Sequence, residues 1–250
     1  MCDLSGRSAL VSGAGAPGGI GFAIAKALKE SGASVHITST TDRIFDRAKE
    51  IGATASVADL TVESECRKVV GKLTSLDILV NNAGMTAIKD AAKSDESGPL
   101  TEISLEGFRR GIARNVETSF NLTKFSLPLL RKSPSGRIIM ISSVTGPQMA
   151  MRNQPVYATA KAALVGLIRS LAIDEAQYGI TANAILPGWI ATDTQNKFES
   201  AQGMRTPLGR SGKPEEIASL VNWLASPSSG YMTGQALIVD GGNSISEEFH

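Results

Sequence analysis

Short apolar runs alternate along this chain with longer segments in which apolar residues recur every three or four positions. The short runs are typical of buried strands, and the longer segments are typical of helices that pack on them. Seven strands are predicted, over residues 8–12, 33–38, 54–58, 76–80, 137–141, 181–186 and 236–239. Because strands and helices alternate, the pattern predicts an α/β fold built from βαβ units.

The helical pattern is clearest over residues 22–31, 104–130, 155–172 and 214–224. Ser104 is placed to cap the second of these helices, because its hydroxyl can accept a hydrogen bond from the first turn. We expect that helix to run without interruption, since its apolar residues keep near-helical spacing at Phe108, Ile112, Val116, Phe120 and Leu122.

Two polar stretches interrupt the regular pattern. Residues 85–100 are predicted to be a mobile connection on the ligand side. Residues 190–212 mix Phe198 and Met204 with polar residues, and we interpret them as a substrate lid. No internal repeat or low-complexity linker divides the chain, so residues 1–250 are predicted to form a single domain.

The first strand runs into a glycine-rich loop, and a helix follows the loop directly. Glycines let the backbone approach a pyrophosphate closely, while free amides and the dipole at the helix start favour its negative charge. This order of strand, glycine loop and helix, with Gly13, Gly15, Gly18, Gly19 and Gly21, predicts a dinucleotide site.

The end of the second strand bears on which dinucleotide is bound. An acidic residue there binds a ribose 2′-hydroxyl, whereas its absence and a nearby basic residue accommodate a 2′-phosphate. Ser39 and Thr40 place hydroxyls at this end, and Arg43 lies within reach of a phosphate. We therefore expect NADP(H) rather than NAD(H), with Asp42 as the residue that opposes this assignment.

Asp59 follows the third strand and has two interpretations of equal weight. Its carboxylate could hold the adenine amino group, or it could cap the next helix.

Tyr157 and Lys161 lie one helical turn apart, just past Pro155, which suits the first turn of a helix. A free phenol has a pKa of about 10, and lowering it to about 7 requires roughly 4 kcal/mol of differential stabilisation of the phenolate. The Lys161 ammonium, one turn away, supplies part of this stabilisation. The pair predicts a proton donor and acceptor, although the same spacing also occurs in surface pairs.

The composition limits the classes of ligand and partner that the chain is expected to bind. Lys and Arg number 25 against 24 acidic residues, so the net charge of +1 gives no electrostatic case for nucleic acid or an anionic membrane. No apolar N-terminal run resembles a secretion signal, and no apolar run is expected to reach the length of a membrane span, so we expect a cytoplasmic protein. Cys2 and Cys66 have no metal-site or disulfide spacing, and no metal is expected.

Taken in order, these segments resemble the short-chain dehydrogenase/reductase family from Ser8 to about Asn243. The motifs are individually modest, but their joint order is specific. They are the glycine loop, Asp59, Asn81-Asn82-Ala83-Gly84, Asn115, Ser143, Tyr157-x-x-x-Lys161, Pro187-Gly188 with Thr192, and Thr233-Gly234-Gln235 to Gly242. The resemblance implies a doubly wound (Rossmann) parallel sheet of seven strands with helices on both faces, in three α/β/α layers, and a nicotinamide cofactor.

Roles for the catalytic residues come with the resemblance. Tyr157 is expected to be the acid in reduction and the base in oxidation, with Lys161 lowering its pKa and holding the nicotinamide ribose. Ser143 would bind the substrate oxygen, and Asn115 would hold a water that links Lys161 to solvent. The cofactor would be bound by Gly13, Gly15, Gly19, Ile20, Gly21, Ser39, Thr40, Arg43, Asp59, Leu60, Asn82, Ala83, Gly84, Tyr157, Lys161, Pro187, Gly188, Ile190 and Thr192.

The chain departs from the family pattern in two places. Five residues separate Gly13 from Gly19, where the family has three before its Gly-x-Gly pair. Either Gly15 takes the role of the first glycine, or the loop carries an insertion. Ser143 stands one residue further from Tyr157 than is common, and it is preferred to Ser142 because it begins the family's Ser-x-x-Gly frame.

The chain looks most like the 3-oxoacyl carrier-protein reductase branch, which implies NADPH-dependent reduction of a 3-oxoacyl thioester or similar ketone. A dehydrogenase of a sugar, polyol or steroid-like alcohol would use the same residues. A non-catalytic NADP-binding regulator is the alternative from another class. The resemblance and the many apolar positions of the Tyr157 helix also predict a homotetramer.

Overall fold

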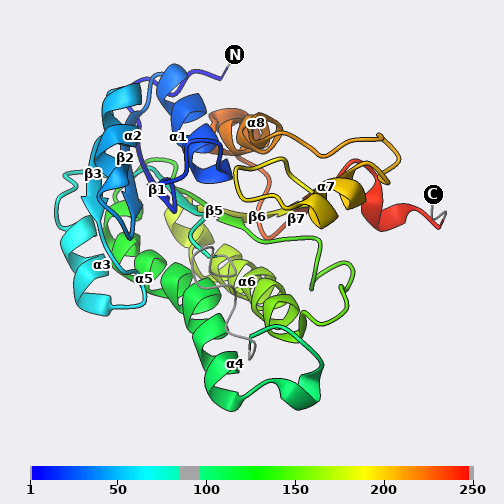
Figure 1. The fold of residues 1–250 in the computed structure, drawn as a ribbon. Coiled ribbons are helices and arrows are strands. Elements are labelled where there is room, and N and C mark those ends of the chain that lie inside the picture. The colour runs from blue at the N-terminus through cyan, green and yellow to red at the C-terminus, as the bar shows by residue number, and fades with distance from the viewer. Residues whose placement is uncertain (1, 85–95, 248–250) are drawn as a thin grey trace.

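The computed structural model describes residues 2–84 and 96–247, and its centre is one parallel sheet of seven strands (Figure 1). The strand order is β3-β2-β1-β4-β5-β6-β7, and all neighbours are parallel. The strands are β1 Ser8–Ser12, β2 Ser34–Ser39, β3 Thr54–Val57, β4 Ile78–Asn81, β5 Arg137–Ile141, β6 Thr181–Pro187 and β7 Ala236–Val239.

Helices cover both faces of this sheet, which confirms the predicted three-layer architecture (Figure 1). One face carries α1 Ile20–Glu30, α2 Arg43–Ile51 and α8 Pro214–Ala225, and the other carries α3 Glu63–Val70, α5 Thr118–Leu130 and α6 Pro155–Asp174. The strands are apolar toward both layers. In β5, Ile139 and Ile141 face the first layer, while Ile138 and Met140 face the second.

The chain reverses its direction of travel across the sheet between β1 and β4. Strands β2 and β3 are added on one side of β1, and the remaining four on the other. In such sheets a crevice opens at the carboxyl ends of the strands where the order reverses, and ligands bind there. The glycine loop and the segment after β4 both leave the sheet at this point.

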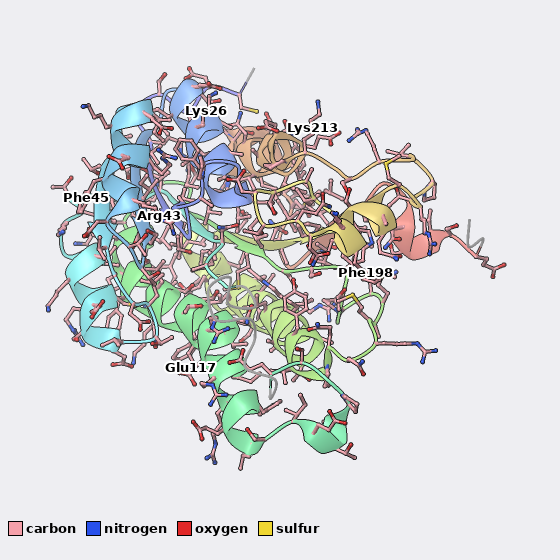
Figure 2. The ribbon with its side chains drawn as sticks, in the orientation of Figure 1. Lys26, Arg43, Phe45, Glu117, Phe198 and Lys213 are labelled. Carbon is pink, nitrogen blue, oxygen red and sulfur yellow. The ribbon has the colours of Figure 1, made fainter. Side chains whose placement is uncertain are left out.

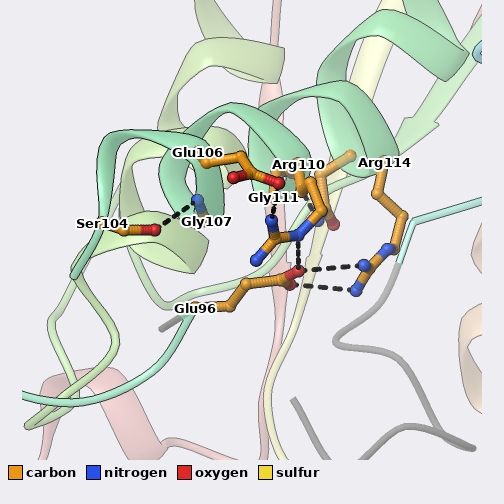
Figure 3. Close-up of polar contacts among 8 residues, drawn as sticks. Glu96, Ser104, Glu106, Gly107, Arg110, Gly111 and Arg114 are labelled. Atoms are coloured by element: carbon orange, nitrogen blue, oxygen red, sulfur yellow. Dashed lines mark hydrogen bonds and ion pairs between the residues drawn. The ribbon is translucent and has the colours of Figure 1, made fainter. Parts of the chain in front are cut away.

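The helix expected over residues 104–130 is not continuous, so that prediction is wrong in its middle. It divides into α4 Leu105–Ile112, a π-helical turn η2 Ala113–Glu117, and α5. Ser104 caps α4 as expected, since its Oγ accepts a hydrogen bond from the amide of Gly107 at 2.9 Å (Figure 3). The break falls at Asn115, where side chains donate hydrogen bonds to backbone carbonyls of the helix.

The lid segment contains a helix that the apolar pattern did not predict, α7 Lys197–Gly203. In the described part of the chain there are also four short 3₁₀ turns: η1 Leu100–Glu102, η3 Ala176–Tyr178, η4 Pro227–Ser229 and η5 Asn243–Ile245. Of the connection predicted over 85–100, residues 85–95 lie outside the described residues.

Helix α6 corrects the expectation that no apolar run reaches the length of a membrane span. Its 20 residues are long and apolar enough to cross a membrane by length and composition, as core helices of soluble proteins also are. Here α6 packs against β6, and Leu164, Val165 and Ile168 are buried in the core.

Candidate active site

Tyr157 and Lys161 lie in the first two turns of α6. Pro155 occupies the first helical position, as predicted, and the two side chains are one turn apart. Lys161 is only 3% exposed, and its Nζ donates a hydrogen bond to the carbonyl of Ile141 at 3.2 Å. Burial lowers the pKa of this ammonium from 10.5 to about 8. Lys161 is therefore part of the interior and Tyr157 is partly exposed, so the two are not a solvated surface pair.

The two serines at the end of β5 have different roles in the structure. The Ser142 hydroxyl donates to the Lys161 carbonyl at 2.8 Å and so holds α6 against the sheet. The hydroxyl of Ser143 forms a hydrogen bond with the Tyr157 phenol, and it also accepts one from the Thr145 amide at 3.1 Å. Ser143 is thus the serine that the structure brings to the tyrosine.

The pKa of Tyr157 is raised above its usual value of 10, and burial is the largest cause. The hydrogen bond from Ser143 lowers the pKa, and the carboxylate of Glu199 raises it further. Lys161 Nζ lies 5.6 Å from the centre of the Tyr157 ring and is not among the groups that shift the pKa. The expectation that Lys161 lowers the tyrosine pKa is therefore not met in this geometry, because its ammonium is directed to a backbone carbonyl.

Asn115 lies in the π-helical turn, which packs against α6. Its side chain is 3% exposed, and its Nδ2 donates to the Gly111 carbonyl at 3.0 Å. Its Oδ1 is buried and has no hydrogen-bond partner among the described residues. A buried amide oxygen without a partner costs free energy, so this atom is suited to bind a water or ligand group. A side-chain carbon at Gly84 would lie 3.0 Å from it.

The glycine loop is built for close backbone approach. Gly13 has a φ of +70°, and a Cβ there would lie 2.8 Å from the Ala83 backbone. A Cβ at Gly21 would lie 2.6 Å from the carbonyl of Gly13 and 2.4 Å from Asn82 Nδ2. Gly13 therefore takes the role of the first glycine, and the loop carries the insertion. Gly15 lies elsewhere, against Ser39, whose Oγ would be 2.9 Å from its Cβ.

The segment after β4 is fixed to this loop by hydrogen bonds. Asn82 Nδ2 donates to the carbonyls of Ser12 and Gly13 at 3.1 and 3.0 Å. Ser12 Oγ accepts from the amides of Asn82 and Ala83, both at 3.0 Å. The predicted cofactor residues of the two segments are thus brought together around one cradle.

Ser39 is the last residue of β2, so no carboxylate ends that strand. Its Oγ donates to the Thr41 carbonyl at 3.1 Å. Thr40, Asp42 and Arg43 are exposed, and Arg43 begins α2 (Figure 2). Among the described residues the guanidinium makes one hydrogen bond, a long one of 3.4 Å from Nε to Thr41 Oγ1.

Asp59 does not cap the following helix, which removes one of its two interpretations. Helix α3 begins after Val62 without a side-chain cap. The Asp59 Oδ1 instead accepts from the amide and the hydroxyl of Thr61 at 2.9 and 2.7 Å. Leu60 is buried, and its carbonyl accepts from Asn121 Nδ2 at 3.2 Å.

Residues after β6 lead into the lid. The amide of Gly188 donates to the Val239 carbonyl at 3.0 Å, directly after Pro187. Ile190 pairs with Gly212, which closes the base of the lid. Thr192 Oγ1 lies 3.0 Å from Thr194 Oγ1.

Two lid residues near the site were not predicted from the sequence. The carboxylate of Asp193 accepts a hydrogen bond from the Gly18 amide at 2.6 Å, so the lid contacts the glycine loop. Glu199 lies in the first turn of α7, and its carboxylate raises the pKa of Tyr157. Glu199 could have been identified from the sequence, because Asn196 and Glu199 have the spacing of a capping box, and they form one in the structure.

The residues present fit a dinucleotide, although the structure itself contains only protein. The glycine positions form a cradle that a single Cβ would fill, and it lies at the crevice where open sheets bind nucleotides. Ser143, Tyr157 and Lys161 lie together at the carboxyl end of β5 and on α6 beside it. The π turn that carries Asn115 packs against the same helix.

Comparisons with known proteins agree with this geometry. A family model described as enoyl-(acyl carrier protein) reductase matches residues 13–244. The chain is 37% identical to the 3-oxoacyl-(acyl-carrier-protein) reductase FabG of Rickettsia bellii, over 97% of this chain and 98% of that one. It is 35% identical to a tropinone reductase homolog of Arabidopsis thaliana, over 97% and 95% of the two chains.

Solved structures give the same picture. The RhlG/NADP active-site complex of Pseudomonas aeruginosa superposes with a TM-score of 0.87 at 32% identity, covering 97% of this chain and 98% of that one. The aldohexose dehydrogenase of Thermoplasma acidophilum superposes with a TM-score of 0.86 at 29% identity, covering 99% and 97%.

Proposed function

The chain belongs to the short-chain dehydrogenase/reductase family of oxidoreductases, and we propose that it reduces a ketone, such as a 3-oxoacyl thioester, with NADP(H). The observation that carries the proposal is the arrangement of the buried Ser143 and Lys161 around the partly exposed Tyr157. The Ser143 hydroxyl is hydrogen-bonded to the Tyr157 phenol, and the buried Lys161 ammonium lies on the same face of α6 as Tyr157.

When bound, the nicotinamide supplies a hydride to the carbonyl carbon. Tyr157 gives the proton to the oxygen as a general acid, and its raised pKa keeps the phenol protonated near pH 7. Ser143 orients the carbonyl oxygen with its hydroxyl. Lys161 would hold the nicotinamide ribose, and Asn115 would hold a water on the path of the returning proton.

The glycine loop and the amides at the start of α1 would hold the pyrophosphate. Ser39, Thr40 and Arg43 support a 2′-phosphate, because no carboxylate at the end of β2 would repel it. The similar RhlG structure is described as an NADP complex, which agrees with this assignment.

Substrate class rests on the lid and on the relatives. Large apolar side chains of the lid are exposed, namely Phe198, Met204 and Leu208. Phe198 packs edge-on against Trp189, with ring centres 6.5 Å apart, and Figure 2 shows it below α7 on the side toward α6. An apolar lid suits an acyl chain, and FabG relatives are named for a 3-oxoacyl substrate.

A dehydrogenase of a sugar, polyol or steroid-like alcohol is the second candidate. The structural similarity to an aldohexose dehydrogenase favours it. A panel of 3-oxoacyl thioesters, small ketones, sugars and polyols, assayed with each cofactor by the absorbance of reduced nicotinamide, separates the two. Turnover of sugars alone would reject the ketone assignment, and no turnover with any of them, in a protein that binds NADPH, would favour a non-catalytic regulator.

We further propose a cytoplasmic homotetramer. Exposed apolar side chains on the α4–α6 layer support association, among them Leu105, Phe120 and Ile173, which are 62%, 48% and 79% exposed. Light scattering at micromolar concentration is expected to give four times the chain mass, and a monomer would contradict the assembly.

A further inference from the structure

Glu96 is a buried carboxylate beside α4 and the π-helical turn. It is 6% exposed, and two arginines of the neighbouring helix use both of its oxygens (Figure 3). Arg114 donates to Oε2 and to Oε1, each at 3.1 Å, and Arg110 Nε donates to Oε1 at 3.3 Å. A bidentate ion pair of this kind fixes the orientation of the arginine as well as compensating the charge of the carboxylate. Burying a carboxylate is costly unless it is paired in this way, so the contact is expected to persist.

Arg114 belongs to the π-helical turn and directly precedes Asn115. A π turn is rare, and something must occupy the carbonyls that an α-helix would use. Here Asn115 Nδ2 donates to the Gly111 carbonyl, and Thr118 Oγ1 donates to the Arg114 carbonyl, each at 3.0 Å. These bonds satisfy carbonyls of the turn from within the helix, whereas the pair between Arg114 and Glu96 joins the turn to a segment outside the helix.

We propose that Glu96 is a positioning residue for catalysis, which holds the π turn through Arg114 so that Asn115 faces the site. The proposal rests on the function proposed above, because it needs Asn115 in the proton path. Glu96 touches neither substrate nor cofactor and acts only through Arg114. Rotation of the turn would move Asn115 Oδ1, which has no partner among the described residues, away from Gly84 and from α6. The glycine loop is held by its own hydrogen bonds to Asn82.

The test compares Glu96→Gln with Glu106→Gln. Glu106 pairs with the same Arg110, at 2.8 Å, but it is 84% exposed and does not contact Arg114, so it is a matched control (Figure 3). We expect Glu96→Gln to lower kcat about tenfold, less than the roughly 10²–10⁴-fold of a group that transfers the proton itself, with the KM for the ketone and the Kd for NADPH unchanged. The control should keep its kcat. Equal kcat in both variants would overturn the proposal.

A second measurement does not depend on turnover. Hydrogen exchange of residues 111–118 should rise in Glu96→Gln and stay unchanged in Glu106→Gln. Arg114→Gln should reproduce the effect, and the double variant should be no worse than either single one. If exchange rises while kcat is unchanged, Glu96 is only structural and the proposal fails. If the wild type reduces no ketone, the proposed function fails, while exchange still decides whether Glu96 holds the turn.

Discussion

The two ends of the proposed cofactor site each carry one cation, and their surroundings differ sharply. Lys161, at the nicotinamide end, is 3% exposed and its Nζ donates to a backbone carbonyl. Arg43, at the adenosine end, is exposed and makes one long hydrogen bond among the described residues. Burial lowers the pKa of Lys161 to about 8. The same formal charge therefore has different consequences at the two ends.

The difference separates chemistry from selectivity. In the interior, charges interact strongly with their neighbours, but each one destabilises the fold unless it is compensated. At the surface, water screens the charge, so an arginine can discriminate between ligands with little effect on stability. We expect variants at the nicotinamide end to change rate and stability together, and variants at the adenosine end to change only cofactor preference.

The largest effect is expected at Tyr157. Tyr157→Phe keeps the ring and its packing and removes only the proton donor, so kcat should fall by about 10²–10⁴-fold. The Kd for NADPH, measured by nicotinamide fluorescence, should stay close to that of the wild type. A variant that keeps most of its kcat on a ketone would reject Tyr157 as the acid.

Lys161→Met is expected to abolish turnover and to stabilise the fold. The lowered lysine pKa means that the folded state binds its proton less tightly than the unfolded chain. The penalty is full below pH 8 and disappears as the pH rises through 10.5, and for a shift of this size it amounts to roughly 3 kcal/mol. Urea unfolding at pH 7 should show the variant more stable, and at pH 10.5 the two should converge. A less stable variant at pH 7 would mean that the ammonium is compensated after all.

Much of the catalytic end could be predicted from the sequence because it depends on local signals. The strand over 137–141 and the position of Pro155 at the start of α6 are as expected. The spacing of Tyr157 and Lys161 places both on one face. The direction of the Lys161 ammonium could not be predicted, because it depends on the Ile141 carbonyl, which is far away in sequence and close in the fold.

The π turn at Asn115 and helix α7 show where the sequence reasoning fell short. Apolar spacing through residues 104–130 is nearly helical, and one extra residue in a turn barely disturbs it. Only the side-chain bonds to carbonyls reveal the break. Helix α7 has few apolar positions, yet its capping box was visible as Asn196 and Glu199.

The smallest effect is expected at Arg43, and it tests the other half of the comparison. A charge-assisted hydrogen bond to a 2′-phosphate is typically worth about 1.5–3 kcal/mol, or roughly ten- to hundredfold in affinity. Because Arg43 is exposed, water and salt screen its charge, so we expect a contribution near the lower end of this range. Arg43→Ala should therefore lower kcat/KM for NADPH about tenfold, leave that for NADH unchanged, and leave the free energy of unfolding unchanged.

The control for this variant is Lys49→Ala, which removes an exposed cation from the last turn of the same helix, α2. If it lowers kcat/KM for NADPH as much as Arg43→Ala does, the effect is only the net charge of α2. Raising the salt concentration should reduce the Arg43 effect, because an exposed pair is screened, whereas the Tyr157 effect should not change with salt. Asp42 lies beside Arg43 and is exposed too. A wild type that prefers NADH would mean that this carboxylate, rather than the arginine, faces the ribose.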